Sequence, residues 1–245
     1  MRTERRTNMR IVMMVIRNFF RLPYYWFMLN YFGRANDSHT EEERYRFLRK
    51  FVRRVNYTGR VEIITTGSEY LEGKKGYILF PNHQGLFDVL ALIESCPNPF
   101  GVVIKKEAVN IILIKQVVRF LRGISMDRED LRSSMQVINQ MTEEVKQGRN
   151  YVIFPEGTRS KLGNTILDFK AGTFKSAVNA KCPIIPVALI DSYKPFDQQS
   201  IKATVVQVHY LKPIEYEEYK GMKTKEIAAM VQARIQSAID EKIGR

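Results

Sequence analysis

Short apolar runs alternate with stretches of helical periodicity from about residue 60 to the end of the chain. A short continuous apolar run predicts a strand buried on both faces, whereas apolar residues three and four positions apart predict a helix with one buried face. The predicted strands cover residues 61–66, 76–81, 101–105, 123–126, 151–154, 184–190 and 204–211. The predicted helices lie near residues 86–95, 107–121, 129–147, 172–180 and 224–243. This alternation is typical of an α/β domain whose mostly parallel central sheet, here of about seven strands, is flanked by helices.

Apolar and basic residues are mixed in a different way between residues 9 and 31. Aliphatic and aromatic side chains surround Arg10, Arg17 and Arg21, and Pro23 is predicted to separate two short helices. At the headgroup boundary of a membrane, rings bury their apolar bodies while arginines reach phosphates, so this mixture indicates a membrane-surface anchor. The alternative is a helix pair packed on the domain's own core. The candidate anchor residues are Arg17, Phe19, Phe20, Arg21, Trp26 and Phe27.

A second basic helix is predicted from Glu41 to about Val55, with apolar residues on one stripe and six arginines and lysines around it. The stripe consists of Tyr45, Leu48, Val52 and Val55. Here membrane contact and a solvated charged face over a packed stripe are equally good interpretations. The predicted organisation is a basic amphipathic anchoring segment at residues 1–58, followed by an α/β domain at residues 59–245.

The net charge of +13 is concentrated at the front of the chain. Residues 1–60 hold 14 basic and 5 acidic side chains, so 14 − 5 gives +9 of that total. Such an excess calls for a polyanionic partner, either an anionic membrane or nucleic acid. An RNA-binding sheet studded with aromatic residues is not visible, and the aromatic residues cluster with aliphatic ones in the front helices. We therefore expect an anionic membrane surface as the partner, and no nucleic acid.

The front segment is expected to lie on the membrane and not to span it. Arg17 and Arg21 interrupt its apolar residues, and an arginine at the bilayer centre costs roughly 2.5–3.5 kcal/mol. The same interruptions, with Pro23, argue against a cleavable secretory signal. Cys96 and Cys182 lie far apart beside apolar runs, which offers no disulfide framework and indicates a reducing compartment. The predicted location is the cytoplasmic face of the cell membrane, as a peripheral protein.

A histidine follows the apolar strand that ends near Pro81, at the carboxyl end of the strand, where α/β sheets build their sites. On a continuous helix His83 and Asp88 would point to different faces, but a strand-to-helix turn eased by Gly85 can bring them together. A carboxylate fixes the tautomer of an imidazole and stabilises the imidazolium, which makes the pair a competent base near neutral pH. The alternative is a pair used only for capping and packing.

Basic residues also follow other predicted strands. Four cations fall at or just beyond strand ends, on the rim where His83 is expected: Lys105, Lys106, Arg128 and Arg159. Pro155 ends one of these strands, Gly157 lets the backbone approach a ligand closely, and the guanidinium of Arg159 suits a phosphate. We interpret these cations as a phosphate-binding group, although each alone could be an ordinary exposed base.

Four ordered blocks between about Tyr77 and Leu189 give the sequence a specific resemblance. They are N-H-Q-G-L-F-D at 82–88, G-I-S-M-D-R at 123–128, F-P-E-G-T-R-S at 154–160 and C-P-I-I-P-V-A-L at 182–189. With them the chain resembles the glycerolipid acyltransferases, and among these the bacterial 1-acylglycerol-3-phosphate acyltransferases. The second block departs slightly from the usual pattern at Ser125 and Met126.

The resemblance implies a reaction and a set of roles. His83 would be the general base, oriented by Asp88, and would activate the sn-2 hydroxyl of lysophosphatidic acid toward an acyl thioester of acyl carrier protein or coenzyme A. The product would be phosphatidic acid, and no cofactor is called for. The implied acceptor-binding residues are Lys105, Gly123, Arg128, Glu156, Gly157, Thr158 and Arg159. Pro186, in the fourth block, would be structural.

Other activities fit less well. A hydrolase could use the same base to activate water, but no G-x-S-x-G elbow is present, and the apolar surroundings of both cysteines predict buried, inert thiols. The three histidines are widely spaced and H-E-x-x-H is absent, so no metal is expected. Acylation of glycerol 3-phosphate or of another lysophospholipid remains an alternative. A non-enzymatic module that binds anionic lipid or RNA is the alternative outside the enzymes.

Overall fold

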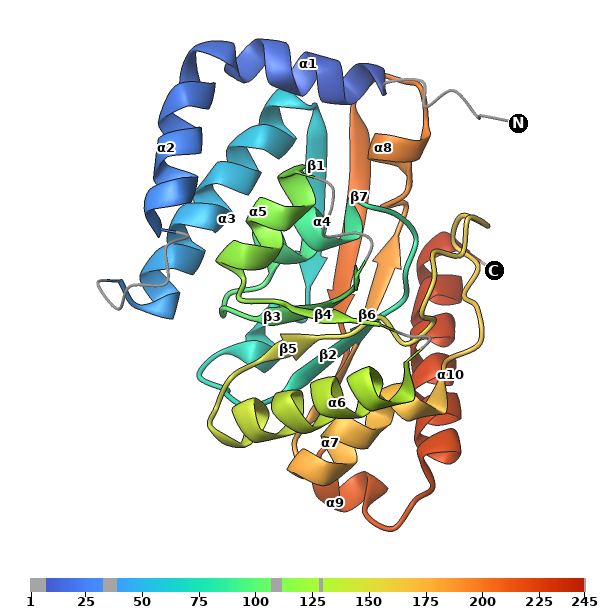
Figure 1. Cartoon of the computed structure of the whole chain (residues 1–245). Helices are drawn as coiled ribbons and strands as arrows, with labels where there is room; N and C mark the ends of the chain where they lie inside the picture. The colour runs from blue at the N-terminus through green and yellow to red at the C-terminus, as the bar shows by residue number, and fades with distance from the viewer. Residues whose placement is uncertain (1–7, 33–38, 107–111, 128–129, 245) are drawn as a thin grey trace.

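The computed structural model describes residues 8–32, 39–106, 112–127 and 130–244. Its sheet has seven strands in the order β1-β7-β6-β2-β5-β3-β4, and of the strand pairs described, β6 with β7 is antiparallel and the others are parallel (Figure 1). The strands are β1 (Val61–Thr66), β2 (Ile78–Pro81), β3 (Gly101–Lys105), β4 (Ile124–Met126), β5 (Tyr151–Val152), β6 (Ile184–Ile190) and β7 (Thr204–Tyr210). Each strand lies within its predicted range, and the predicted α/β fold is confirmed.

Strand β6 shows why short apolar runs in the sequence predicted the strands. All seven of its residues are buried. Val187 and Leu189 belong to a hydrophobic core on one face of the sheet, whereas Ala188 and Ile190 belong to the core on the other face. Side chains alternate across a strand, so a strand covered on both sides must be apolar at every position.

Helices cover both faces of this sheet (Figure 1). One core is shared with α3 (Glu41–Thr58), α4 (Asp88–Ser95) and α5 (Ile112–Phe120). The opposite core is shared with α6 (Leu131–Lys146), α7 (Lys175–Ala180) and α10 (Thr224–Ile243). The helix predictions are confirmed for the residues described, although residues 107–111 and 129 lie outside them and the segment before α7 is a 3₁₀ turn, η4 (Ala171–Phe174). The sequence did not predict three short elements, namely η2 (Ser68–Leu71), α8 (Lys194–Asp197) and α9 (Tyr216–Tyr219).

The front segment forms two helices, α1 (Met9–Asn18) and α2 (Leu22–Phe32), joined by the 3₁₀ turn η1 (Phe19–Arg21). Pro23 is the second residue of α2, within the first turn, where a helix does not use the missing N–H. Pro23 therefore follows the break between two helices, as predicted.

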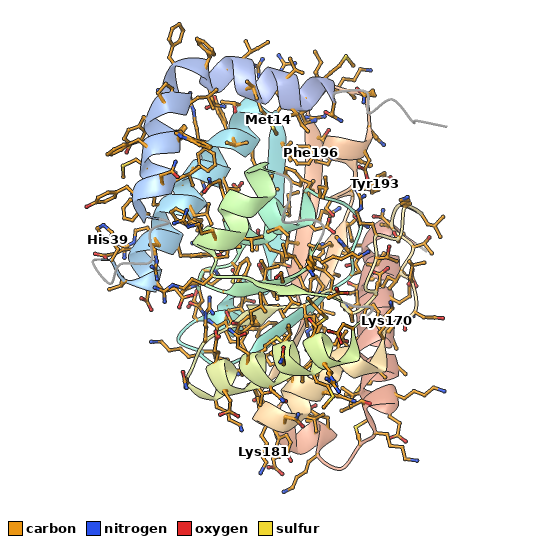
Figure 2. All side chains as sticks on the ribbon, viewed as in Figure 1. Met14, His39, Lys170, Lys181, Tyr193 and Phe196 are labelled. Carbon is orange, nitrogen blue, oxygen red and sulfur yellow. The ribbon has the colours of Figure 1, made fainter. Side chains whose placement is uncertain are left out.

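The two front helices have an inner and an outer side. On the inner side Met14 and Leu29 are buried in the core that α3 shares, and Figure 2 shows Met14 beneath α1. On the outer side Ile16 is 67% exposed, Phe20 95% and Phe27 64%. The helices therefore pack on the protein's own core, as the alternative interpretation expected, and they also present an apolar outer side. Within the described ranges, no helix is long and apolar enough to cross a membrane.

Arg10 departs from the prediction that the arginines of this segment reach phosphates. Its side chain is fully buried, and its guanidinium donates to Gly59 O at 2.6 Å, Lys202 O at 2.9 Å and Thr204 Oγ1 at 2.9 Å. Carbonyls that follow the last turn of a helix need donors, and the five N–H groups of an arginine supply several at once. The prediction is wrong for Arg10, which instead joins the end of α3 to the start of β7.

Candidate active site

The first block begins where β2 ends at Pro81. Beyond Pro81 the buried side chain of Asn82 extends the contact with β6: its carboxamide oxygen accepts the Leu189 N–H at 2.7 Å, and its amide donates to Leu189 O at 3.0 Å. The side chain of Asn82 thereby fixes the chain direction immediately before His83.

The turn that follows brings His83 and Asp88 together. His83 Nδ1 lies 2.7 Å from Asp88 Oδ2, and the same oxygen accepts the Gln84 N–H at 2.7 Å and the Gly85 N–H at 3.0 Å. A Cβ on Gly85 would lie 3.3 Å from Tyr193 Cα, so glycine fits this position because another chain segment approaches closely. The predicted proximity of the two side chains is confirmed.

The hydrogen bond with Asp88 determines how the imidazole can act. An ionised carboxylate only accepts, so Nδ1 carries the proton and Nε2 presents its lone pair. The ring packs against Phe154 with centroids 4.2 Å apart, and the His83 side chain is 21% exposed while that of Asp88 is 0% exposed. The arrangement is an imidazole held through Nδ1 in a side chain that is partly exposed.

Residues of the third block hydrogen-bond to both the backbone N–H and the backbone carbonyl of His83. Glu156 Oε1 accepts the His83 N–H at 2.6 Å, and the Ser160 N–H donates to His83 O at 2.9 Å. The other Glu156 oxygen accepts the Leu167 N–H at 3.0 Å. Burial raises the pKa of the Glu156 carboxyl, although the hydrogen bonds from His83 and Leu167 act in the opposite direction. Both oxygens of Glu156 are engaged with the protein's own backbone.

The remaining residues of the third block lie nearer the surface. Gly157 has φ +71°, a left-handed conformation that favours glycine. Thr158 is exposed and Arg159 is partly buried. Burial raises the pKa of Asp197, whereas the nearby positive charge of Arg159 lowers it, which places this guanidinium within electrostatic reach of α8.

Lys105 ends β3, and the second block, which is only partly described, contains β4. Lys105 is exposed at the end of β3, at the same edge of the sheet as His83, and two strand spacings of about 5 Å separate β3 from β2. Gly123 has a packing reason of its own, because a Cβ there would lie 2.7 Å from Val102 O. Arg128 lies outside the described residues. Lys106 Nζ is 3.8 Å from Asp127 Oδ2.

Three site residues were missed by sequence reasoning. Ser192 Oγ donates to Asp88 Oδ1, and Gln84 and Asn164 complete the network around it. Gln84 directly follows His83 in the first block, and this position in the sequence could have identified it as a site residue. Ser192 follows the strand of the fourth block, and a polar residue after a buried strand is the other signal that the sequence offered.

The two cysteines and the other titratable clusters take no part in this site. Cys96 and Cys182 are buried as predicted, and burial raises the pKa of the thiols to about 11 and about 12 respectively. Thiols with such pKa values are poor nucleophiles at neutral pH. In the part of the chain that the structure describes, no group of three or more His, Cys, Asp or Glu side chains is placed to hold a metal ion.

A family model described as Acyltransferase matches residues 62–190, which is more than half of the chain and contains all four blocks. The chain belongs to the acyltransferase family. The turn that carries His83 and Asp88 lies inside the matched range, and so does Glu156. The resemblance inferred from the blocks is therefore confirmed.

Named members of the acyltransferase family match at moderate identity. The 1-acyl-sn-glycerol-3-phosphate acyltransferase of Borreliella burgdorferi is 31% identical over 165 residues, which cover 64% of this chain and 66% of that enzyme. The enzyme of the same name from Cocos nucifera is 28% identical over 174 residues, or 70% of this chain and 56% of that one. The match with these curated relatives thus spans between about half and two thirds of their length.

One solved structure shares the fold along nearly the whole chain. It is the crystal structure of the 1-acyl-sn-glycerophosphate acyltransferase PlsC from Thermotoga maritima, with a TM-score of 0.77 and 21% sequence identity. The likeness covers 97% of this chain and 98% of that one. At this identity it is the fold that the two proteins share.

Proposed function

We propose that this acyltransferase moves a fatty acyl group from an acyl thioester to the sn-2 hydroxyl of lysophosphatidic acid and so forms phosphatidic acid. The observation that carries the proposal is the hydrogen bond between His83 Nδ1 and Asp88, which leaves Nε2 as a base at an accessible edge of the sheet. The names of the relatives support the choice of acceptor.

The reaction needs one base. His83 Nε2 takes the proton of the acceptor hydroxyl as its oxygen attacks the thioester carbonyl, and Asp88 stabilises the imidazolium that forms. The tetrahedral intermediate then collapses, the C–S bond breaks and the thiolate leaves. Thiols have pKa values of about 8.5, so the leaving group requires little protonation, and the proton held on the imidazolium can be returned to it. No acyl-enzyme is required.

Binding of the acceptor phosphate is assigned to Lys105 and Arg159 at this edge, together with Arg128, which the sequence adds to the group. Lys105, Arg128 and Arg159 would hold the phosphate, with Gly123 shaping the backbone of the second block and Gly157 and Thr158 lining the approach. A fixed phosphate places the hydroxyl at the base and lowers the entropy cost of reaction. Both carboxylate oxygens of Glu156 already accept backbone N–H groups, which supports a role in holding the backbone of His83 in preference to direct contact with the glycerol.

The outer side of α1 and α2 is assigned to the surface of an anionic membrane on its cytoplasmic face. The exposed apolar side chains Phe19, Phe20, Trp26 and Phe27 support insertion at the headgroup boundary, and exposed Arg21 supports contact with phosphates. Arg17 is exposed as well, but one of its guanidinium nitrogens donates to Thr58 O at 2.9 Å. Residues 1–58 would be the anchoring segment and residues 59–245 the catalytic domain, joined through the core that Met14 and Leu48 share with the sheet.

The donor is an acyl thioester of either acyl carrier protein or coenzyme A, because both expose the same reacting group. Acyl transfer by the purified protein tests the proposal, with vesicles that contain anionic phospholipid, each thioester in turn, and three acceptors: lysophosphatidic acid, glycerol 3-phosphate and lysophosphatidylcholine. Phosphatidic acid formed only from lysophosphatidic acid, and lost in His83→Ala, is the expected result. Preference for another acceptor would refute the acceptor assignment, and transfer that survives His83→Ala would refute the base.

A further inference from the structure

A buried hydrogen-bond network extends from Asp88 to a residue beyond the four sequence blocks. Ser192 Oγ donates to Asp88 Oδ1, the carboxylate oxygen that His83 does not contact. Ser192 and Asp88 are both 0% exposed. Water therefore has no direct access to this carboxylate, and the hydroxyl of Ser192 is the donor that the structure gives to Oδ1.

The hydroxyl of Ser192 has two acceptors within reach and one proton. Gln84 Oε1 lies 3.1 Å from Ser192 Oγ, and Asp88 Oδ1 is the other acceptor. An ionised carboxylate is the stronger acceptor. Gln84 Oε1 also accepts the Ser192 N–H at 2.8 Å, so it is satisfied without the hydroxyl. The hydroxyl proton is therefore directed to Asp88.

A sharp turn after β6 aims Ser192 at Asp88. Asp191 has φ +63°, in the left-handed region that residues other than glycine rarely adopt. Asn164 holds this conformation: its carboxamide oxygen accepts the Asp191 N–H at 2.9 Å, and its amide donates to Asp191 Oδ1 at 3.1 Å. Such conformations persist where the surroundings over-determine them, often at functional sites. The fold thus maintains a strained residue next to Ser192.

Gln84 connects the catalytic turn with the loop that follows the third block. Its amide donates to Gly163 O at 3.1 Å and to Asn164 Oδ1 at 2.8 Å, while its oxygen accepts from Ser192. One buried side chain therefore holds three segments together: the turn of His83, the 163–164 loop and the end of β6.

We infer that Ser192 and Gln84 are positioning residues of the acyl-transfer reaction. Ser192 fixes the rotation of the Asp88 carboxylate, and Gln84 fixes Ser192 relative to the turn that carries His83. Without the hydroxyl, a buried carboxylate oxygen lacks its donor, so the carboxylate and its hydrogen bond to the imidazole rearrange. The chemical step slows, whereas substrate binding is retained. The inference rests on the proposed function, since it concerns the same base.

Four variants test the role of Ser192. Ser192→Ala removes the hydroxyl, and Ser192→Thr and Ser192→Val are a matched pair of equal shape that differ in the hydroxyl. Ser176→Ala is the control, because Ser176 is a fully buried serine on α7, which belongs to the opposite core. We expect kcat to fall about tenfold in Ser192→Ala and KM to change less than about twofold, with Ser192→Thr several times faster than Ser192→Val. Equal kcat in Thr and Val variants, or an unchanged kcat in Ser192→Ala, would overturn the inference.

A double-mutant cycle separates positioning from a general packing role. If Ser192 acts through Asp88, then Ser192→Ala causes no further loss of kcat once Asp88→Asn is present. The same fractional loss in both backgrounds would show that Ser192 acts independently of Asp88, and the inference would fail.

A measurement that needs no turnover keeps the inference distinct from the proposed function. The low-field proton resonance of His83 Nδ1–H, assigned by its loss in His83→Ala, reports the hydrogen bond to Asp88 directly. Ser192→Ala is expected to shift or broaden this resonance, and Ser176→Ala to leave it in place. A resonance unmoved by Ser192→Ala contradicts the inference, even if another acyl acceptor proves to be the substrate.

Discussion

The edge of the sheet that carries His83 and the outer side of α1 and α2 are built in opposite ways. At the edge, both carboxylate oxygens of Asp88 and both of Glu156 accept hydrogen bonds from defined donors. On the outer side, Phe20 and Phe27 project aromatic rings that are 95% and 64% exposed. The first region fixes the positions of individual atoms, whereas the second presents exposed apolar surface.

This difference follows from what each region is proposed to do. Proton transfer depends on the distance and direction between two atoms, so the displacement of one group lowers the reaction rate strongly. Adhesion to a membrane sums many small contributions of buried area and charge, so any one residue matters less. Substitutions at the edge should therefore act steeply on kcat, and substitutions on the outer side should act mildly on affinity for vesicles.

Replacement of Asp88 by asparagine should have the largest effect. An amide no longer stabilises the imidazolium, and its NH₂ group can turn toward Nδ1 and leave the proton on Nε2, the wrong tautomer for a base. We expect kcat to fall by about a thousandfold, measured as thiol release at saturating lysophosphatidic acid. Circular dichroism and the midpoint of thermal unfolding serve as controls for folding. A variant that keeps more than a tenth of the activity would contradict the proposed orientation of His83.

Replacement of Glu156 by glutamine distinguishes bracing from substrate binding. One of the two backbone N–H donors, from His83 or Leu167, would then face an NH₂ group and lose its acceptor. We expect kcat to fall about thirtyfold, with little change in the KM for lysophosphatidic acid. If KM rises and kcat is kept, Glu156 contacts the acceptor directly.

The sequence predicted the fold well because the sheet is covered on both faces. A strand such as β6, with seven buried residues, has no polar position to obscure its bounds. The pairing of His83 with Asp88 was predictable for a related reason, since both lie within one short turn at the end of a buried strand. In both cases the prediction needed only residues that are close together in the sequence.

The parts that the sequence did not predict depend on contacts between distant segments. Ser192 meets Asp88 across 104 positions, and a single serine after a strand has no distinctive pattern. Arg10 was grouped with the membrane-facing arginines, but its partners include the backbone carbonyls of Gly59 and Lys202, which every residue possesses. Backbone acceptors leave no trace in composition or periodicity, so a buried arginine and an exposed one look alike in the sequence.

On the outer side, the double variant Phe20→Ser, Phe27→Ser should weaken binding to anionic vesicles about tenfold or somewhat more. Burial of a phenylalanine contributes about 1.5–3 kcal/mol, and shallow insertion of two rings captures part of this. Sedimentation with vesicles measures the effect. Met135→Ser is the control, because Met135 is 62% exposed on α6, which covers the opposite face of the sheet. Equal losses in the two proteins would show that the outer side of α1 and α2 is not the contact surface.

Arg21→Ala should have the smallest effect and the clearest dependence on salt. A basic side chain near an anionic surface contributes about 1 kcal/mol, which corresponds to about fivefold in affinity for vesicles at low ionic strength. Arg21 is a better choice than Arg17, whose hydrogen bond to Thr58 O also links α1 to α3. The loss should shrink toward zero in about 1 M salt, where charges are screened within about 3 Å, whereas the loss caused by the two phenylalanine substitutions should persist. Lys175→Ala, an exposed cation on α7, is the matched control and should leave binding unchanged. A salt-independent loss in Arg21→Ala would mean that its aliphatic stem, and not its charge, contacts the membrane.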